Sequence, residues 1–318
     1  MVRERAFTPT SDEAFQIICT VLASGIIVII AVTGLVLGRG SLLVFHQFGV
    51  DFVAGVKWNA VTGSEVYGIL PYILGTLVTS GIAIGIGIPV SIGIAVFLAE
   101  MAPSIVRVPL SQLVELLAAV PSVVYGLWGI FVLRFWVANY VETPLSKSLG
   151  FLPIFSGSPN GLDLLMAGLI LAIMIIPTIS SISRDVMMAV PASQREAAYS
   201  IGATKWEAVR MGVLSYSRSG IFGAAILGLG RAVGETMAVT MVIGNATGVG
   251  AIPVSLFRSG QTMASLIATE FNEAETGSLQ QSALIGTGLV LFVIAILINV
   301  FAQLMVWKVL KVKAGAVE

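Results

Sequence analysis

Residues 193–207 read SQREAAYSIGATKWE and form the middle of a polar island, 184–219, between two long apolar segments. Ser193 and Glu196 have the spacing of a capping box, in which a hydroxyl and a carboxylate satisfy the first backbone N–H groups of a helix. Gly202 can adopt the left-handed conformation that ends many helices. The pattern predicts a short helix that begins at Ser193 and ends at Gly202.

Thr204 and Glu207 repeat the capping-box spacing, which predicts a second short helix after a bend at Gly202. The two helices would present charged side chains and one tryptophan, Trp206, to water. Capping boxes are common, so these residues alone leave two interpretations open: a solvated connection, or a surface that binds another protein.

The composition is that of an integral membrane protein. Of the 318 residues, 57% are hydrophobic and 11% are charged, against roughly 45–50% and 25% in soluble domains. The formal net charge is zero, so we expect membrane lipid and no nucleic acid around the chain. One cysteine, Cys19, and one histidine, His46, give no disulfide and no expected metal site.

Six apolar segments reach the length of about 20 residues that a helix needs to cross a bilayer. They are Ala14–Leu37, Ile69–Leu98, Leu110–Val132, Leu162–Ile182, Ile221–Ile243 and Leu284–Val306. Pro89, Pro121 and Pro177 fall inside three of them and are expected to kink their helices. The sequence therefore predicts an all-α membrane protein with six transmembrane helices.

Lysine and arginine are unequally distributed between the two sides of these segments. With the N-terminus inside, eleven lie on the cytoplasmic side, five lie outside, and Arg231 falls within a span. Because positive residues favour the cytoplasmic side, both termini and the 184–219 loop are predicted to be cytoplasmic. The predicted division is a tail at 1–13, one membrane domain at 14–308 and a second tail at 309–318.

One outer loop contains a candidate helix. Residues 263–275 place apolar side chains at helical spacing with glutamates beside them, which predicts an amphipathic helix at the outer interface. Such a helix would either receive a partner or pack on its own bundle, and the sequence leaves both open.

Two ionisable residues lie in the fifth span. Arg231 is near its middle, where a charge costs about 2.5–3.5 kcal/mol, and Glu235 follows four residues later, one helical turn along the same face. Such residues mark a transport pathway or form a buried ion pair, and we take both as candidate substrate-pathway residues. Glu115, near the start of the third span, is expected to have an interfacial or interhelical role.

The polar island resembles the EAA loop of the membrane subunits of ABC importers, on Glu196-Ala197-Ala198, Gly202 and Leu214. It departs from that pattern at Gly212, where an aliphatic residue is usual, and at Ser215, where proline is usual. The resemblance implies that the loop docks on an ATPase. The implied coupling residues are Glu196, Ala197, Ala198, Gly202, Lys205 and Trp206.

A more specific resemblance runs from about Tyr67 to Trp307. Residues 228–239, GLGRAVGETMAV, and 115–129, ELLAAVPSVVYGLWG, resemble the PstC-type permeases of phosphate-specific ABC importers, as do shorter stretches at 67–80 and 270–275. The resemblance implies a type I ABC importer permease with cytoplasmic EAA coupling helices. It would carry inorganic phosphate across a prokaryotic inner membrane by alternating access, with Arg231 and Glu235 at positions tied to transport.

The same resemblance implies the partners. They are a PstA-type second permease in a heterodimer, a PstB-type ATPase dimer that holds ATP and Mg²⁺, and a PstS-type phosphate-binding protein. The chain has no Gly-x-x-x-x-Gly-Lys-Ser/Thr pattern, so we expect it to bind no cofactor and to contribute no catalytic residue.

Three other functions stay open at the level of sequence. The first is a permease for another oxyanion, sulfate or molybdate, and the second is a carrier or channel that works without an ATPase. The third is a membrane scaffold without transport. Arginine's planar fork matches the oxygens of phosphate, and a carboxylate such as Glu235 can accept a hydrogen bond from the P–OH that phosphate keeps at neutral pH.

Overall fold

The computed structural model describes residues 9–61 and 63–314, and most of them are helical. Of the tails predicted at 1–13 and 309–318, residues 1–8 and 315–318 lie outside this range.

The elements follow one another along the chain, and the longest connection between two α-helices runs from Val242 to Met263. The α-helices are α1 (Pro9–Gly40), α2 (Leu42–Phe48), α3 (Val50–Ala54), α4 (Leu70–Val96), α5 (Ser104–Ala119), α6 (Ser122–Trp128), α7 (Arg134–Val137), α8 (Thr143–Leu149), α9 (Leu164–Met188), α10 (Ala192–Ser200), α11 (Lys205–Ala208), α12 (Ser215–Gly234), α13 (Met237–Val242), α14 (Met263–Glu270) and α15 (Leu279–Ala314). Wider π-helical turns are η1 (Phe97–Met101), η2 (Gly129–Leu133), η3 (Ala138–Glu142) and η5 (Val209–Leu214), and 3₁₀ turns are η4 (Pro153–Phe155) and η6 (Gly248–Ala251). An antiparallel hairpin pairs β1 (Trp58–Asn59) with β2 (Val66–Tyr67).

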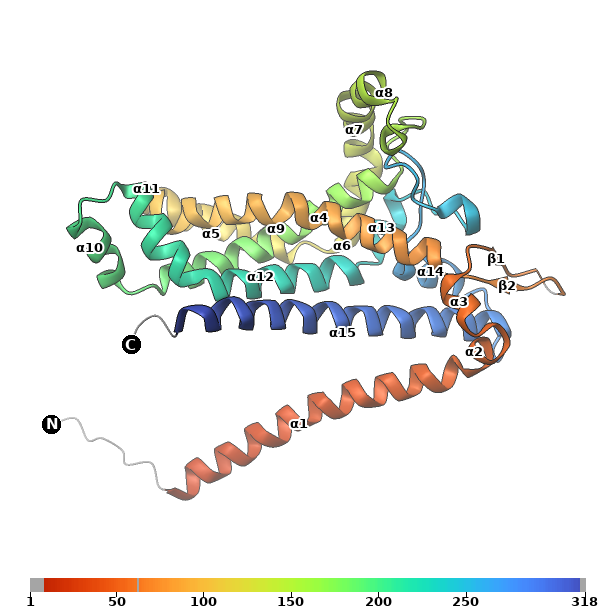
Figure 1. Ribbon diagram of the computed structural model, residues 1–318, viewed down its shortest axis with the longest axis horizontal. Coiled ribbons are helices and arrows are strands. Elements are labelled where there is room, and N and C mark those ends of the chain that lie inside the picture. The colour runs from red at the N-terminus through yellow and green to blue at the C-terminus, as the bar shows by residue number, and fades with distance from the viewer. Residues whose placement is uncertain (1–8, 62, 315–318) are drawn as a thin grey trace.

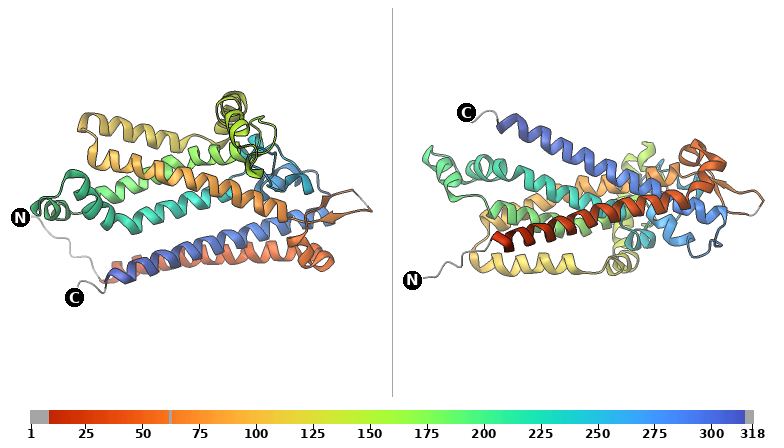
Figure 2. Two further views of the ribbon diagram at one scale, coloured as in Figure 1. Left: turned by 45° about the horizontal axis from the view of Figure 1, so that its top comes forward. Right: turned by 90° about the horizontal axis from the view of Figure 1, so that it is seen from below.

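The long helices lie side by side along the molecule, and two groups of elements occupy its ends (Figure 1). The start of α1, the end of α15 and the pair α10–α11 lie at one end, whereas the hairpin and α14 lie at the other. α1 contacts α15 near α2 and diverges from it toward Pro9 (Figure 2). The 184–219 loop, the start of the first span and the end of the last span are thus gathered at one end (Figure 1).

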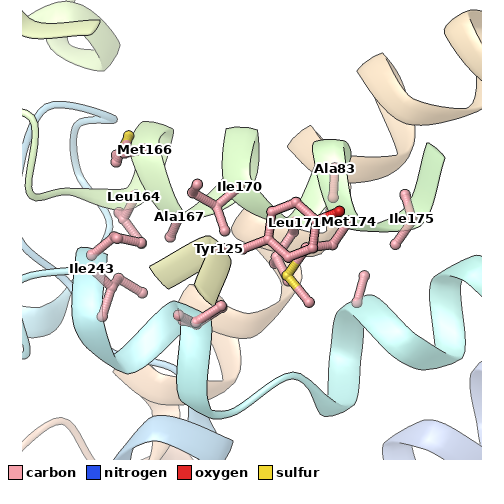
Figure 3. Close-up of a cluster of buried hydrophobic side chains, with 14 of the residues drawn as sticks. Ala83, Tyr125, Leu164, Met166, Ala167, Ile170, Leu171, Met174, Ile175 and Ile243 are labelled. Atoms are coloured by element: carbon pink, nitrogen blue, oxygen red, sulfur yellow. The ribbon is translucent and has the colours of Figure 1, made fainter. Parts of the chain in front are cut away.

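α9 is the central helix. It packs against α4, α5, α12 and α13. In α9, 61% of an 18-residue apolar stretch is buried, whereas no residue of the corresponding stretch of α1 is buried. Its apolar side chains, among them Ile170, Leu171 and Met174, meet Ala83 of α4 and Tyr125 of α6 in the main core (Figure 3). Burial of these side chains gives the bundle a core of its own, while α1 keeps an apolar surface for other neighbours.

Five helical segments of the described residues are long and apolar enough to cross a membrane. They are Glu13–Gly40, Leu70–Met101, Ser122–Leu149, Leu164–Met188 and Leu279–Met305. Two of the predicted spans, Leu110–Val132 and Ile221–Ile243, are not continuous helices, because each is interrupted in its apolar part.

Pro121 interrupts the first of these two. It lacks a backbone N–H and disfavours helical angles at the residue before it, and Val120 is extended with ψ 128°. The carbonyl that loses its helical partner is Leu117 O, which instead accepts from the Tyr125 hydroxyl at 2.9 Å. Pro89 and Pro177, by contrast, lie inside continuous helices. Pro121 therefore breaks the span that it was expected only to kink.

The predicted amphipathic helix at 263–275 is shorter than expected and buried. α14 ends at Glu270, and its first four residues, from Met263 to Leu266, are buried against its own bundle. Thr262 and Ser265 form the capping box that starts it. Of the two alternatives that the sequence left open, the structure therefore favours the second: the helix packs on its own bundle, in the core at this end. Glu270 fastens it by accepting from the Trp58 indole at 2.8 Å.

Candidate functional site: the 192–215 loop and the break after Arg231

The first helix of the loop begins before Ser193. α10 starts at Ala192 after Pro191, and no side chain caps it, so the predicted capping box of Ser193 and Glu196 does not form. Proline has its φ fixed near the helical value, and Pro191, with φ −56°, already sets the direction of the chain. The helix consequently begins without help from a hydroxyl.

The second helix and the bend between the two are as predicted. Gly202 has φ +82°, in the left-handed region that glycine enters without steric cost. Thr204 Oγ1 accepts from the backbone N–H of Glu207, and the Glu207 carboxylate accepts from the N–H of Thr204, which completes a capping box. Thr204 donates to this carboxylate from its backbone N–H at 2.8 Å and from Oγ1 at 2.7 Å, and these two hydrogen bonds hold the pKa of Glu207 below its usual value.

Arg195 fastens this loop to the transmembrane helices. Its Nη2 lies 2.7 Å from Glu100 Oε1, on the η1 turn that follows α4. Its Nη1 and Nη2 donate to the carbonyls of Val190 and Met187 at 2.6 and 3.0 Å. The guanidinium therefore joins α10 to the ends of both α4 and α9, and a movement of α10 would be transmitted to these two helices.

Gly212 accounts for one departure from the EAA pattern. A Cβ at this position would lie 2.9 Å from the carbonyl oxygen of Gln194, so the small residue lets η5 approach the backbone of α10 closely. Ser215, at the other departure, is the first residue of α12, and its helical φ of −64° continues the chain from η5 without a break. The loop is thus a compact unit continuous with α12.

The predicted coupling residues lie on this unit but differ in exposure. Glu196, Ala197, Gly202, Lys205 and Trp206 are exposed, whereas Ala198 is buried. Two large apolar side chains of this loop, Tyr199 and Ile201, are 50% and 77% exposed and were not among the predicted coupling residues. The sequence offered one signal for Ile201: it is an apolar residue directly before Gly202, at the bend of a polar loop.

Arg231 and Glu235 do not lie on one helical face. α12 ends at Gly234, and Glu235 has extended angles, φ −69° and ψ 126°, before α13 begins at Met237. The prediction that both residues lie on one helical face is therefore wrong, and within the described part of the chain the two side chains do not form the ion pair that was the alternative to a transport pathway. Glycine at 234 favours a break, since it is a poor helix former.

Each of the two charges instead has a separate partner. Arg231 Nη1 donates to Thr178 Oγ1 of α9 at 3.2 Å, directly after Pro177. Glu235 Oε1 accepts from the backbone N–H of Ala238 in the first turn of α13 at 3.3 Å. Both side chains are half-buried, and Arg231 keeps donors that no group of the described residues accepts. The break therefore places a cation and an anion next to an interruption of the helix.

Glu115 has the interhelical role expected from its position. Its Oε1 lies 2.9 Å from Nη2 of Arg184, so it ties α5 to the end of α9. Arg184 also contacts Asp185 at 2.7 Å. Both acids are mostly exposed, which identifies this cluster as a surface tie between helices and not as a binding site.

Comparison with known proteins identifies the family. Residues 87–310 match the family described as binding-protein-dependent transport system inner membrane component. The chain is 46% identical to the phosphate transport system permease protein PstC of Haemophilus influenzae, over 86% of each chain. It is 45% identical to PstC of Mesorhizobium japonicum, over 91% of this chain and 89% of the relative.

Solved structures agree on the fold. A bacterial alginate ABC transporter, solved with its alginate pentasaccharide-bound periplasmic protein, superposes with a TM-score of 0.59 at 18% identity, over 94% of this chain and 96% of that chain. The inward-facing methionine transporter MetNI gives a TM-score of 0.51 at 18% identity, over 76% and 94%. The chain therefore belongs to the binding-protein-dependent inner membrane components of ABC importers, and within them to the PstC permeases.

Proposed function

We propose that this chain is the permease subunit of an ATP-driven importer that moves inorganic phosphate into the cell by alternating access. The observation that carries this proposal is the identity of 41–46% to PstC permeases of several bacteria, over more than four-fifths of the chain. The arrangement around Arg231 supports transport over a scaffold, because a membrane-embedded charge with spare donors is costly unless it serves a ligand. The 192–215 loop favours an ATP-driven importer over a stand-alone carrier, which would give this loop no partner.

Arg231 is suited to hold an oxyanion during passage. A guanidinium carries five N–H donors in a planar fork that can bind two phosphate oxygens at once. Its protein partner among the described residues, the neutral hydroxyl of Thr178, orients the fork without neutralising its charge. A hydroxyl can also turn to donate to the same anion. Arg231 and Thr178 would thus contact phosphate together.

Glu235 would distinguish phosphate from sulfate. At neutral pH phosphate keeps a P–OH group, which can donate to a carboxylate, whereas sulfate is fully deprotonated and would be repelled. The extended backbone at Glu235 frees its side chain from the helical position beside Arg231. A bound phosphate could therefore lie between the two residues.

The 192–215 loop would couple the permease to ATP hydrolysis. Tyr199, Ile201 and Trp206 are large exposed apolar side chains that would contact a PstB-type ATPase, and Arg195 would transmit its movement to α4 and α9. ATP and Mg²⁺ would bind only in that ATPase, so this chain would catalyse no reaction.

The remaining assignments follow from the same proposal. A PstA-type permease would complete the membrane part, and a PstS-type protein would deliver phosphate at the hairpin end. The broken third and fifth segments would count as spans, which gives six crossings with both termini in the cytoplasm of a prokaryotic cell.

The test is a competition experiment with the chain reconstituted with its PstA-, PstB- and PstS-type partners. Phosphate delivered by the binding protein is followed into vesicles in the presence of ATP and increasing sulfate. We expect Glu235→Gln to assemble normally and to lower the preference for phosphate over sulfate, while the exposed Glu275→Gln leaves it unchanged. An unchanged preference in Glu235→Gln would remove the role given to this carboxylate, and no uptake by the wild type would overturn the proposed function.

A further inference from the structure

Two acidic residues are buried together where α8 joins the start of α9. Glu142 ends the η3 turn, and Asp163 is the residue before α9. Both have exposed fractions of 0%. They lie at the end of the molecule away from α10 and α11, next to the lobe of α7 and α8 that projects from the bundle (Figure 1).

Half of each carboxylate is satisfied by the backbone. Glu142 Oε2 accepts from the N–H of Gly161 at 3.0 Å, and Asp163 Oδ1 accepts from the N–H of Met166 at 2.9 Å. Gly161 has φ +67° and packs against the carbonyl of Arg134, which fixes the direction of its N–H. The backbone therefore holds both acids in defined orientations.

The second oxygen of each carboxylate has no hydrogen-bond partner among the described residues. Glu142 Oε1 and Asp163 Oδ2 are buried and receive no hydrogen bond. Gly161, which donates to the other oxygen of Glu142, lies two residues before Asp163, so the two unpartnered oxygens belong to neighbouring carboxylates. An ionised carboxylate can only accept hydrogen bonds. Two ionised carboxylates would therefore repel where both side chains are fully buried, whereas one proton between them would make a hydrogen bond.

The surrounding charges do not replace that proton. Arg134 is a cation close enough to Glu142 to act on its charge, and its Nε donates to the carbonyl of Asn160 at 2.8 Å. Lys147 of α8 and Arg258 of the neighbouring loop are exposed. In the described part of the chain no cation lies within ion-pair distance of either acid. One nearby positive charge balances a pair that holds a single proton.

We propose that Glu142 and Asp163 are a binding site for one shared proton, which fastens the 138–149 segment to the start of α9. The folded chain then holds a proton that the two acids, once exposed by unfolding, release above about pH 4. Because the folded state binds more protons than the unfolded state, its stability falls as pH rises above this value. The stability stops falling at the pH at which the pair loses its proton in the folded state.

The first test is the apparent Tm of the full chain in lipid nanodiscs across the range from acid to alkaline pH. One proton corresponds to a decrease of roughly 2–4 °C per pH unit. Glu142→Gln and Asp163→Asn keep the acceptors for Gly161 and Met166 and supply an amide N–H in place of the proton. Each variant should therefore flatten this dependence, and the exposed Glu273→Gln should retain the wild-type slope.

A second measurement does not depend on the folding of the variants. Infrared spectroscopy of the wild type at neutral pH should show the C=O stretch of a protonated carboxylic acid, which disappears at alkaline pH. Absence of this band would overturn the proposal. It would also be overturned if Glu142→Gln and Asp163→Asn both kept the wild-type dependence of Tm on pH. A rise in Tm with Na⁺ or Ca²⁺, but not with choline at equal ionic strength, that both variants abolish would overturn it too, because a metal cation would then occupy the site.

Discussion

Replacement of Arg195 by methionine should loosen the loop without unfolding the bundle. The change removes the contact to Glu100 at 2.7 Å and both donations to the carbonyls of Met187 and Val190. Methionine keeps an unbranched apolar stem, so the effect comes mainly from the lost charge and donors.

The magnitude follows from the burial of the pair. The side chains of Arg195 and Glu100 are 25% and 12% exposed, between an exposed pair that contributes about 0–1 kcal/mol and a buried pair whose disruption costs about 3–5 kcal/mol. We expect a local loss of about 2–3 kcal/mol. This corresponds to faster amide hydrogen exchange in α10 by about 30- to 150-fold, if exchange follows local opening.

The assay is hydrogen exchange measured by mass spectrometry on the full chain in nanodiscs. Glu100→Gln should accelerate exchange in α10 by less, because the donations of Arg195 to the carbonyls of Val190 and Met187 remain. Its addition to Arg195→Met should have little further effect, because the contact between the two side chains is already lost. Arg210→Met, a change of the same kind at an exposed site on the same loop, should have no effect on α10. Exchange in α10 within about twofold of the wild type after Arg195→Met would refute the reasoning.

Two further predictions concern the bend and the cap of the second helix. Gly202→Ala should destabilise the bend by about 1 kcal/mol, because the left-handed φ of +82° is unfavourable for alanine, although a Cβ would meet nothing within 4 Å. Gly202→Asn should destabilise it less. Hydrogen exchange at residues 198–204 compares the two variants. The cap at Thr204 should weaken in acid, because the pKa of Glu207 is lowered in the folded loop and its contribution is lost as pH falls through that lowered pKa. Exchange in α11 should therefore rise in acid in the wild type, and Thr204→Ala should remove most of that dependence.

Local patterns in the sequence predicted what depends on near neighbours. The capping box of Thr204 and Glu207 and the bend at Gly202 need only a few adjacent residues, and both are present. The predicted capping box at Ser193 does not form because Pro191 starts the helix earlier. The spacing rule for a capping box does not take a nearby proline into account. The all-α membrane fold followed from hydropathy, which is an average over long segments.

Contacts between distant segments were not available from the sequence. Arg195 meets Glu100 across 95 positions, and the partner of Arg231 is Thr178 on another helix. Spacing alone placed Arg231 and Glu235 on one helical face, but the backbone breaks between them after Gly234. Apolar composition similarly concealed the break at Pro121, since hydropathy does not register a missing N–H.

The most direct test of the proposed phosphate path is ATP-dependent uptake of radiolabelled phosphate by the reconstituted complex with Arg231→Gln. Loss of one charged hydrogen-bond donor to the anion corresponds to a decrease of about 10- to 150-fold, with normal assembly and normal ATP binding by the partner. Arg218→Gln, at an exposed position of the same helix, should transport as the wild type does. Undiminished uptake by an assembled Arg231→Gln complex would contradict the account and leave Arg231 as a structural tie between α12 and α9.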